Sequence, residues 1–266
     1  MLTAKNIEVR LGGNRILSGI DLAAPGGELV AVIGPNGSGK TTLMRALSGD
    51  LPFSGRASLH GLDIARAKPW ELACLRGVLP QSSNLSFPFT VREIVQLGIR
   101  EGTADGDPGI ISAALDRVDL SGFEGRMYQE LSGGEQQRVQ LARVLCQVWS
   151  PKYDGKARYL FLDEPVSSLD IRHQLQIMNV ARDFVARGGG VLAILHDLNL
   201  TAMFADRVVL LKNGRVRADG KPHEVLTAEI LRRAYDCGLT VGRTPPDGPV
   251  FVLPHGAMPS GRHVNG

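Results

Sequence analysis

The 266-residue sequence predicts an α/β fold with an open, mostly parallel sheet. Three observations predict this fold class. Continuous apolar runs of strand length recur at residues 29–33, 159–162 and 191–195, as in strands that are buried on both faces. A glycine-rich loop follows the first of these runs and leads directly into a helix. Amphipathic helical patterns separate the later runs, as crossover helices do between parallel strands.

The first third of the chain contains most of the predicted strands. Residues 2–33 are predicted to form strands that are joined by glycine-containing turns. After the glycine-rich loop, a helix is expected over about residues 40–48, with Leu43 and Leu47 turned inward. Residues 50–80 return to strands and turns, with one short helix near their end.

A mostly helical block, from about residue 91 to residue 148, interrupts the series of strands. A polar loop at residues 102–109 divides this block into two parts. The apolar strand pattern resumes at residues 159–162. We therefore interpret the helical block as an insertion between two strands of one sheet.

The last part of the chain begins with a helix after Asp170 and ends in an irregular tail. The tail, residues 244–266, is rich in proline and glycine, and the spacing of its His255 and His263 is not that of metal ligands. The helix is predicted to end at residues 188–190. Its inward face is expected to carry Ile171, Leu175, Met178, Ala181 and Val185.

Composition excludes several classes of protein. The chain is 43% hydrophobic and 21% charged with a net charge of +3, and it has no run of five basic residues, which argues against a nucleic-acid partner. No apolar run approaches the roughly 18 residues of a membrane span, and the N-terminus lacks the apolar segment of a signal peptide. We therefore expect a cytoplasmic protein that reaches a membrane only through a partner. The three cysteines lack metal or redox spacing and are expected to be reduced.

The glycine-rich loop matches the pattern G-x-x-x-x-G-K-[ST] at every position. Its glycines let consecutive backbone N–H groups surround phosphate oxygens, while the lysine adds a positive charge and the threonine hydroxyl is a possible Mg²⁺ ligand. The preceding strand and the following helix are the context that this motif requires. The residues predicted to bind a nucleotide are Gly34, Pro35, Asn36, Gly37, Ser38, Gly39, Lys40, Thr41 and Thr42.

Residues 131–137, LSGGEQQ, carry a second and more specific signal. A purely structural interpretation exists, because Ser132 and Glu135 form a capping box at the start of an amphipathic helix. Two adjacent glycines in that first turn are harder to explain, since each costs about 1 kcal/mol relative to alanine. Their presence makes sense if an anion approaches bare backbone at the positive end of the helix.

LSGGEQQ resembles the signature of ATP-binding cassette (ABC) ATPases. The resemblance implies a RecA-like P-loop NTPase core with an N-terminal antiparallel β subdomain and an inserted helical subdomain at about 91–148, together spanning residues 2–243. It also implies two facing copies of the chain, each completing the other's ATP site. The residues expected to act in trans are Leu131, Ser132, Gly133, Gly134, Glu135 and Gln136, with Ser168 and Asp170 of the D-loop beside them.

The same resemblance assigns roles at three strand ends. Residues 159–164 resemble a Walker B segment, in which Asp163 lies beside Mg²⁺ and Glu164 is the general base. Gln81 resembles the Q-loop glutamine and His196 the switch histidine. Taken alone, each is equally a structural residue at a strand end. The expected catalytic residues are Glu164, His196 and Gln81, and the expected Mg²⁺ ligands are Thr41, Gln81 and Asp163.

One element departs from the family pattern. Many ABC ATPases stack an aromatic side chain on adenine, but residues 9–13 contain no aromatic residue. Arg10 could stack its guanidinium group on the base instead, or Leu11 could pack against it.

Residues 79–91 resemble the Q-loop segment of ATPases that serve importers of haem, ferric siderophores and cobalamin, with Phe87 or Phe89 expected in the core. Residues 141–145, 150–158 and 196–200 resemble the haem-import members in particular. This resemblance implies ATP and Mg²⁺ as cofactors and coupling of ATP hydrolysis to haem (hemin) uptake. It further implies a homodimer bound to two copies of a transmembrane permease at the cytoplasmic face of the inner membrane, with a periplasmic haem-binding protein as an indirect partner. Siderophore or cobalamin import, or a soluble non-transport ABC ATPase, are the alternatives.

Overall fold

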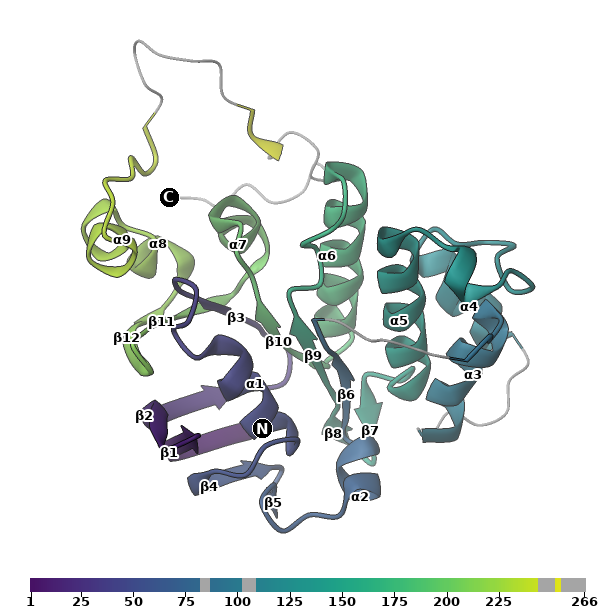
Figure 1. The fold of residues 1–266 in the computed structure, drawn as a ribbon, viewed down its shortest axis with the longest axis horizontal. Helices are drawn as coiled ribbons and strands as arrows, with labels where there is room; N and C mark the ends of the chain where they lie inside the picture. Colours follow the sequence, from purple (N-terminus) through teal and green to yellow (C-terminus); the bar gives the residue numbers. More distant parts are fainter. Residues whose placement is uncertain (82–86, 102–108, 244–251, 255–266) are drawn as a thin grey trace.

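A computed structural model of the chain describes residues 1–81, 87–101, 109–243 and 252–254 (Figure 1). The predicted polar loop and tail lie mostly outside these residues. The described strands are β1 (Leu2–Leu11), β2 (Asn14–Ala24), β3 (Leu29–Ile33), β4 (Ser54–Leu59), β5 (Leu62–Asp63), β6 (Arg76–Leu79), β7 (Lys152–Tyr153), β8 (Lys156–Ala157), β9 (Tyr159–Asp163), β10 (Gly190–Ile194), β11 (Arg207–Lys212) and β12 (Arg215–Gly220). The described helices are α1 (Lys40–Ser48), α2 (Pro69–Ala73), α3 (Val91–Glu101), α4 (Ile110–Arg117), the 3-10 turn η1 (Tyr128–Glu130), α5 (Gly133–Gln147), α6 (Ile171–Ala186), α7 (Leu198–Phe204), α8 (Pro222–Val225) and α9 (Ala228–Tyr235).

The predicted α/β fold is confirmed. One sheet has the strand order β12-β11-β3-β10-β9-β6, and within it only β12 runs antiparallel to its neighbour. A second sheet, β2-β1-β4-β5, is antiparallel throughout. Figure 1 shows this second sheet beside α1 and, on the opposite side of the molecule, the helices α3, α4 and α5.

The strands of the parallel sheet are buried on both faces, as their continuous apolar runs predict. Alternate residues of β9 belong to different cores: Leu160 and Leu162 pack with the helices α3 to α6, whereas Tyr159 and Phe161 pack with α1 and the antiparallel sheet. The two cores therefore stack four layers: antiparallel sheet, α1, parallel sheet, and the helices of the other face.

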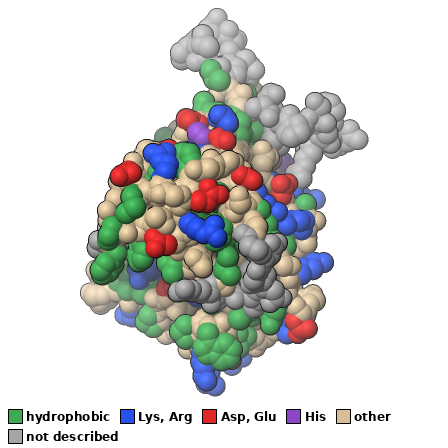
Figure 2. All heavy atoms as spheres, turned by 90° about the vertical axis from the view of Figure 1, so that its right-hand side faces the viewer, with side chains coloured by type: hydrophobic (Ala, Val, Ile, Leu, Met, Phe, Trp, Pro, Cys, Tyr) green, Lys and Arg blue, Asp and Glu red, His purple; other side chains and the backbone are tan. Residues whose placement is uncertain are grey.

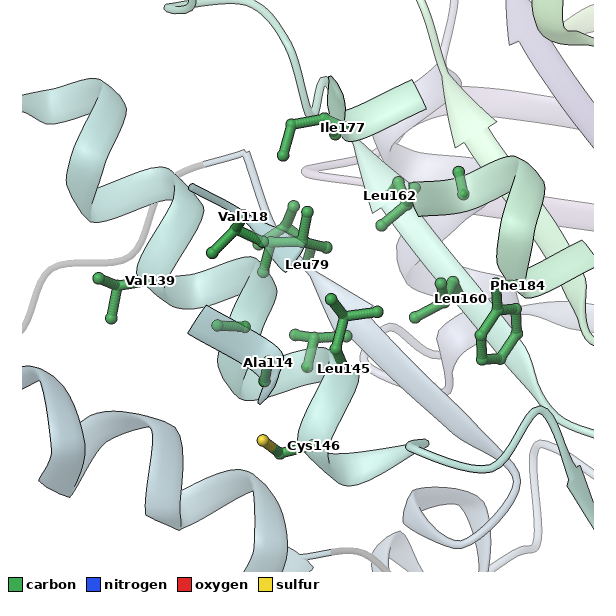
Figure 3. Packing of buried hydrophobic residues seen from close by; sticks show 14 of the residues in the cluster. Leu79, Ala114, Val118, Val139, Leu145, Cys146, Leu160, Leu162, Ile177 and Phe184 are labelled. Carbon is green, nitrogen blue, oxygen red and sulfur yellow. The ribbon is translucent and has the colours of Figure 1, made fainter. Parts of the chain in front are cut away.

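The helical block lies between β6 and β9 in sequence, although these two strands are neighbours in the sheet. The C-terminal half of α5 packs directly on that sheet, where Leu145 lies near Leu79 and Leu160 (Figure 3). Its approach to β6 is close, because a Cβ on Gly77 would lie 2.7 Å from Val144 Cγ1. On the outer face of the block, acidic, basic and apolar side chains are interspersed over the described residues (Figure 2).

One expectation needs correction. The inward face of α6 does not include Ile171, which is 62% exposed because the helix begins at this residue, whereas Met178, Ala181 and Val185 are buried as expected. The short helix expected within residues 50–80 is α2, which ends at Ala73 before the chain enters β6 at Arg76. Residues 150–158 form a β7–β8 hairpin with exposed residues 152–156 and with Arg158 buried at its end.

Candidate functional site

The carboxyl ends of four parallel strands meet at one edge of the sheet, as the doubly wound topology requires. β3 leads into the glycine-rich loop, β9 into Asp163 and Glu164, β10 toward His196, and β6 toward Gln81. Between them lies a pocket of about 680 Å³. It is lined by Ile16, Asn36, Gly37, Gly39, Lys40, Thr41, Thr42, Gln81, Glu164 and His196.

Two glycines of the loop are required by its backbone. Gly34 has φ 145°, and a Cβ there would lie 2.0 Å from the carbonyl oxygen of Leu211. Gly39, with φ 100°, precedes the first residue of α1, and a Cβ there would meet Leu17 at 2.7 Å. The loop can therefore turn sharply from β3 into α1, which points the N-terminus of the helix at the pocket.

Lys40 is only 6% exposed, and among the described residues no carboxylate lies within ion-pair distance of its ammonium group. Nζ donates instead to the carbonyl oxygens of Gly34, at 2.8 Å, and Pro35, at 3.1 Å. Burial lowers the pKa of Lys40, and the carboxylates of Glu164 and Asp163 partly oppose that shift. A buried cation held only by loop carbonyls is placed to exchange them for an anionic oxygen.

Asp163 is 4% exposed, and its Oδ1 accepts a hydrogen bond from the Thr41 hydroxyl at 3.3 Å. Burial raises the pKa of Asp163, and the nearby Glu164 raises it further. The described residues contain no cluster of three or more histidine, cysteine, aspartate or glutamate side chains that could hold a metal. One hydroxyl and one carboxylate nevertheless fit Mg²⁺, which is commonly held by one or two carboxylates together with substrate phosphates.

Glu164 is the centre of the polar contacts in the pocket. Its Oε1 lies 2.5 Å from Nε2 of His196, and its Oε2 accepts from Gln81 Nε2 at 3.0 Å. The backbone at Glu164 is left-handed, with φ 53°, and its carbonyl oxygen accepts from Gln137 Nε2 at 3.1 Å. The Glu164 carboxylate, at the end of β9, is thus held by side chains from the ends of β6 and β10. The Glu164 backbone is held by Gln137 of α5.

The first six LSGGEQQ residues lie outside this pocket, whereas Gln137 contacts the backbone of Glu164. Ser132 caps α5, because its hydroxyl oxygen accepts a hydrogen bond from the Glu135 N–H. In return, the Glu135 carboxylate accepts from the hydroxyl and the backbone N–H of Ser132. These two bonds lower the pKa of Glu135, and the hydroxyl has the larger effect. A Cβ on Gly133 would meet nothing within 4 Å, whereas one on Gly134 would lie 3.1 Å from Leu169. None of residues 131–136 lines the pocket.

The predicted D-loop residues also lie outside the pocket. Asp170 caps α6 by accepting from the His173 N–H at 2.9 Å, and the Ser168 carbonyl lies beside Gly134. The structure therefore sorts the predicted residues into two groups: those gathered around the pocket, and those on a separate surface at the start of α5 and α6.

Sequence reasoning missed two residues. Ile16 lines the pocket beside the loop, whereas Arg10 and Leu11 do not line it. The expected contact of Arg10 or Leu11 with the base stays a prediction. Gln137 was read only as part of the signature, yet it joins α5 to Glu164. No local pattern in the sequence marks either role.

Comparison with known proteins agrees with this arrangement. The family model described as ABC transporter matches residues 17–167. A protein of Mesorhizobium japonicum named hemin import ATP-binding protein HmuV is 56% identical over 97% of this chain and 100% of its own length. The HmuV of Rhizobium meliloti is 58% identical over 97% and 99%.

Solved structures give the same fold. An ATP-binding subunit of an ABC transporter superposes with a TM-score of 0.74 at 22% identity, covering 88% of this chain and 93% of the other. The cassette MJ0796, in a dimeric post-hydrolysis state bound to ADP and Pi, gives 0.72 at 25% identity over 84% and 99%. With the pocket, the separate LSGGEQQ surface and these matches together, the chain belongs to the ABC transporter family as an ATP-binding, ATP-hydrolysing cassette.

Proposed function

We propose that this chain is the ATPase subunit of a hemin importer. The relatives named hemin import ATP-binding proteins, 54–58% identical over nearly the whole chain, support the cargo. The observation that carries the mechanism is the division of the motif residues between one pocket and one separate surface. A complete site then needs two copies of the chain.

Within the pocket, ATP binds with its phosphates against the loop amides and Lys40 Nζ. The ammonium group then gives up its hydrogen bonds to the carbonyls of Gly34 and Pro35 and donates to the β- and γ-phosphate oxygens. Ile16 packs against the base where an aromatic residue is absent. Thr41 and Asp163 would hold Mg²⁺, with Gln81 beside them, and a bound ion would supply positive charge to the phosphates.

Glu164 is the general base. Its carboxylate accepts a proton from the water that attacks the γ-phosphorus, and the bond to the leaving ADP oxygen breaks in line with that attack. His196, 2.5 Å from this carboxylate, orients it and then contacts the γ-phosphate. Gln81 holds the other carboxylate oxygen and links the site to the helical block.

Two copies face each other head to tail, so that Ser132 and Gly134 of one contact the nucleotide held by Lys40 of the other. ATP favours the closed pair because only the closed state offers contacts from both copies. Hydrolysis removes the γ-phosphate contacts and reopens the pair.

The partners that complete the importer are two permease copies, with a periplasmic haem-binding protein reached through them. Among the described residues no helix has the length and hydropathy of a membrane span. The hemin import relatives support a place at the cytoplasmic face of the inner membrane, which the chain reaches through the permease. Phe87, 69% exposed beside the partly buried Phe89, is available to a permease segment. The proposed domain comprises residues 2–243, with the helical subdomain at about 91–148, and the predicted irregular tail, residues 244–266, lies mostly outside the described residues.

The test is reconstitution in liposomes of the chain with the membrane permease that co-purifies with it, with the binding protein supplied either inside or outside the liposomes. We expect ATP-dependent hemin transport that Glu164→Gln abolishes. Transport of a ferric siderophore or cobalamin in place of hemin would overturn the cargo. Recovery of only non-membrane partners from detergent extracts would overturn the importer itself.

A further inference from the structure

The turn between β11 and β12 is a tight two-residue connection. Lys212 pairs with Arg215, so Asn213 and Gly214 form the whole turn. Their φ angles are 53° and 67°, and two consecutive positive values are what a type I′ hairpin turn requires. This turn is not part of the pocket lining, and it lies far beyond the residues that match the family model.

The turn joins two walls of the nucleotide pocket. The Gly214 N–H donates to the carbonyl oxygen of Ser38, in the phosphate-binding loop, at 3.1 Å. The Gly214 carbonyl accepts from the Ser18 N–H, in β2, at 2.9 Å. A Cβ on Gly214 would lie 2.1 Å from the carbonyl oxygen of Ile16, the residue that lines the pocket from β2. One residue, Gly214, therefore bridges the phosphate-binding loop and the β2 wall through its N–H and its carbonyl group.

The end of β11 contacts the same loop at its other end. The Leu211 carbonyl fills the space where Gly34 would carry a Cβ. The hairpin thus touches the loop at its first glycine and again at Ser38, so a shift of the hairpin displaces the loop as a unit.

Lys212 ties the turn to the C-terminal helix α9. Its Nζ donates to the Arg233 carbonyl at 2.7 Å and to both carboxylate oxygens of Asp236, at 2.8 and 2.7 Å. Asp236 ends α9 in a left-handed conformation, with φ 56°. The side chain of Lys212 is 20% exposed, whereas that of Asp236 is 77% exposed, so solvent screens the ion pair and the Arg233 carbonyl gives Nζ a second, uncharged partner.

A separate apolar cluster attaches α9 to the residue that precedes the loop. Ile33 packs with Leu231 and Ala234 of α9 and with Val225 of α8. The C-terminal helix is therefore connected to the loop by packing at Ile33 and by the ion pair at Lys212.

We propose that Lys212 and Asp236 are positioning residues for nucleotide binding, acting through the Asn213–Gly214 turn on the phosphate-binding loop and the β2 wall. They touch neither nucleotide nor reacting atoms. Their loss lets the two walls separate, which weakens ATP binding while leaving the Glu164–His196 pair, at the ends of other strands, in place. This inference rests on the proposed nucleotide site.

The experiment compares Lys212→Met and Asp236→Asn with Asp219→Asn in the full-length chain. Asn tolerates the left-handed conformation at position 236, so that variant removes charge without straining the backbone. Asp219 pairs with Arg207 at 2.6 and 2.7 Å across the opposite end of the same hairpin, which makes it the matched control. Calorimetric titration with ATP, steady-state ATPase kinetics and thermal unfolding are measured for each.

Lys212→Met and Asp236→Asn are expected to raise the ATP Kd and KM on the order of fivefold, the size typical of mutations that act on a site without touching its ligand. Their kcat should stay within about twofold of the wild type. Asp219→Asn should lower Tm without changing Kd. Equal Kd values in all three variants, or a fall in kcat at unchanged Kd, would overturn the inference. Absence of ATP binding by the wild type would instead refute the proposed nucleotide site.

Discussion

Asp163 is kept ionised at a cost to the stability of the empty protein. It is almost fully buried, and the only neutral hydrogen bond to it comes from Thr41. Its raised pKa means that the fold favours the protonated form, so its contribution to stability is fully present below the unfolded pKa and is lost as pH rises through the folded pKa. At neutral pH the nucleotide-free protein therefore carries a destabilising charge that a bound cation would offset.

Asp163→Asn, which imitates the protonated acid, is expected to raise Tm at pH 7 while abolishing ATP hydrolysis. Each kcal/mol gained corresponds to about 2–4 °C in a protein of this size. The difference in Tm between variant and wild type should shrink as the pH is lowered toward 4. Differential scanning calorimetry without nucleotide, together with a phosphate-release assay, provides both measurements.

Asp206→Asn is the matched control for this prediction. Its carboxylate accepts from the Arg182 guanidinium and, at 2.8 Å, from the Leu29 N–H, so it has a direct ion-pair partner, whereas Asp163 has its hydrogen bond from Thr41 and the more distant charges of Lys40 and His196. The same chemical change there should lower Tm by leaving a buried guanidinium group short of its partner. If both variants lost stability alike, burial of an uncompensated charge at Asp163 would be the wrong explanation.

The residues whose roles were predictable from sequence are those of contiguous motifs. Lys40 and Thr41 follow from the loop pattern, and Asp163 from its place at the end of an apolar strand. Ile16 and Gln137 were not predictable, because each acts across a tertiary contact: Ile16 through the approach of β2 to the loop, and Gln137 through the packing of α5 against the residue after β9.

At the scale of elements, α5 begins with a well-formed cap followed by two glycines. The packing of the helix accounts for one of these glycines and not for the other. Gly134 lies against Leu169 and the Ser168 carbonyl, which leaves little room for a side chain. Gly133 faces open space, so nothing within one copy of the chain accounts for it.

Gly133→Ala is expected to stabilise the isolated chain by up to about 1 kcal/mol, since alanine is the better helix former. It should at the same time weaken ATP-dependent dimerisation and hydrolysis, because a methyl group would stand where the partner's nucleotide approaches. Chemical denaturation and ATPase assays measure the two effects. Retained ATPase activity in the stabilised variant would mean that this glycine faces no nucleotide.

The elements that were predicted well are those whose pattern repeats over their full length. The runs that became β3, β9 and β10, and the helix α1, are placed by continuous burial or by clear helical spacing. The inward face of α6 was predicted correctly at Met178, Ala181 and Val185 but wrongly at Ile171, where the helix begins beyond the edge of the core. The β7–β8 hairpin was missed because its strands have only two residues each, and the burial of Arg158 depends on its stacking over Tyr153.

At the scale of the whole molecule, one folded chain contains every part of an ATPase site but does not bring the parts together. Glu164→Gln keeps the shape of the side chain and hydrogen-bonding groups for His196 and Gln81, but it cannot take up a proton. We expect hydrolysis to fall at least 100-fold, with ATP still bound. Light scattering should then detect a dimer that ATP maintains, and a variant that stays monomeric at saturating ATP would contradict the two-copy site.

The decisive test asks which copy supplies the LSGGEQQ residues. Lys40→Ala removes the phosphate contact of one chain, and Gly133→Glu places a negative charge at the start of α5, where the helix dipole tolerates it but a phosphate would not. If the residues act in trans, a mixture of these two inactive variants forms heterodimers with one intact site, and hydrolysis returns. A chain that carries both substitutions should then inhibit the wild type, because each site of that heterodimer contains one defect. If they act in cis, both outcomes reverse: the mixture stays inactive and the double variant does not inhibit. An unfolded Gly133→Glu or double variant would give the same readings as the cis model, so the folding of each variant is verified by circular dichroism before the chains are mixed.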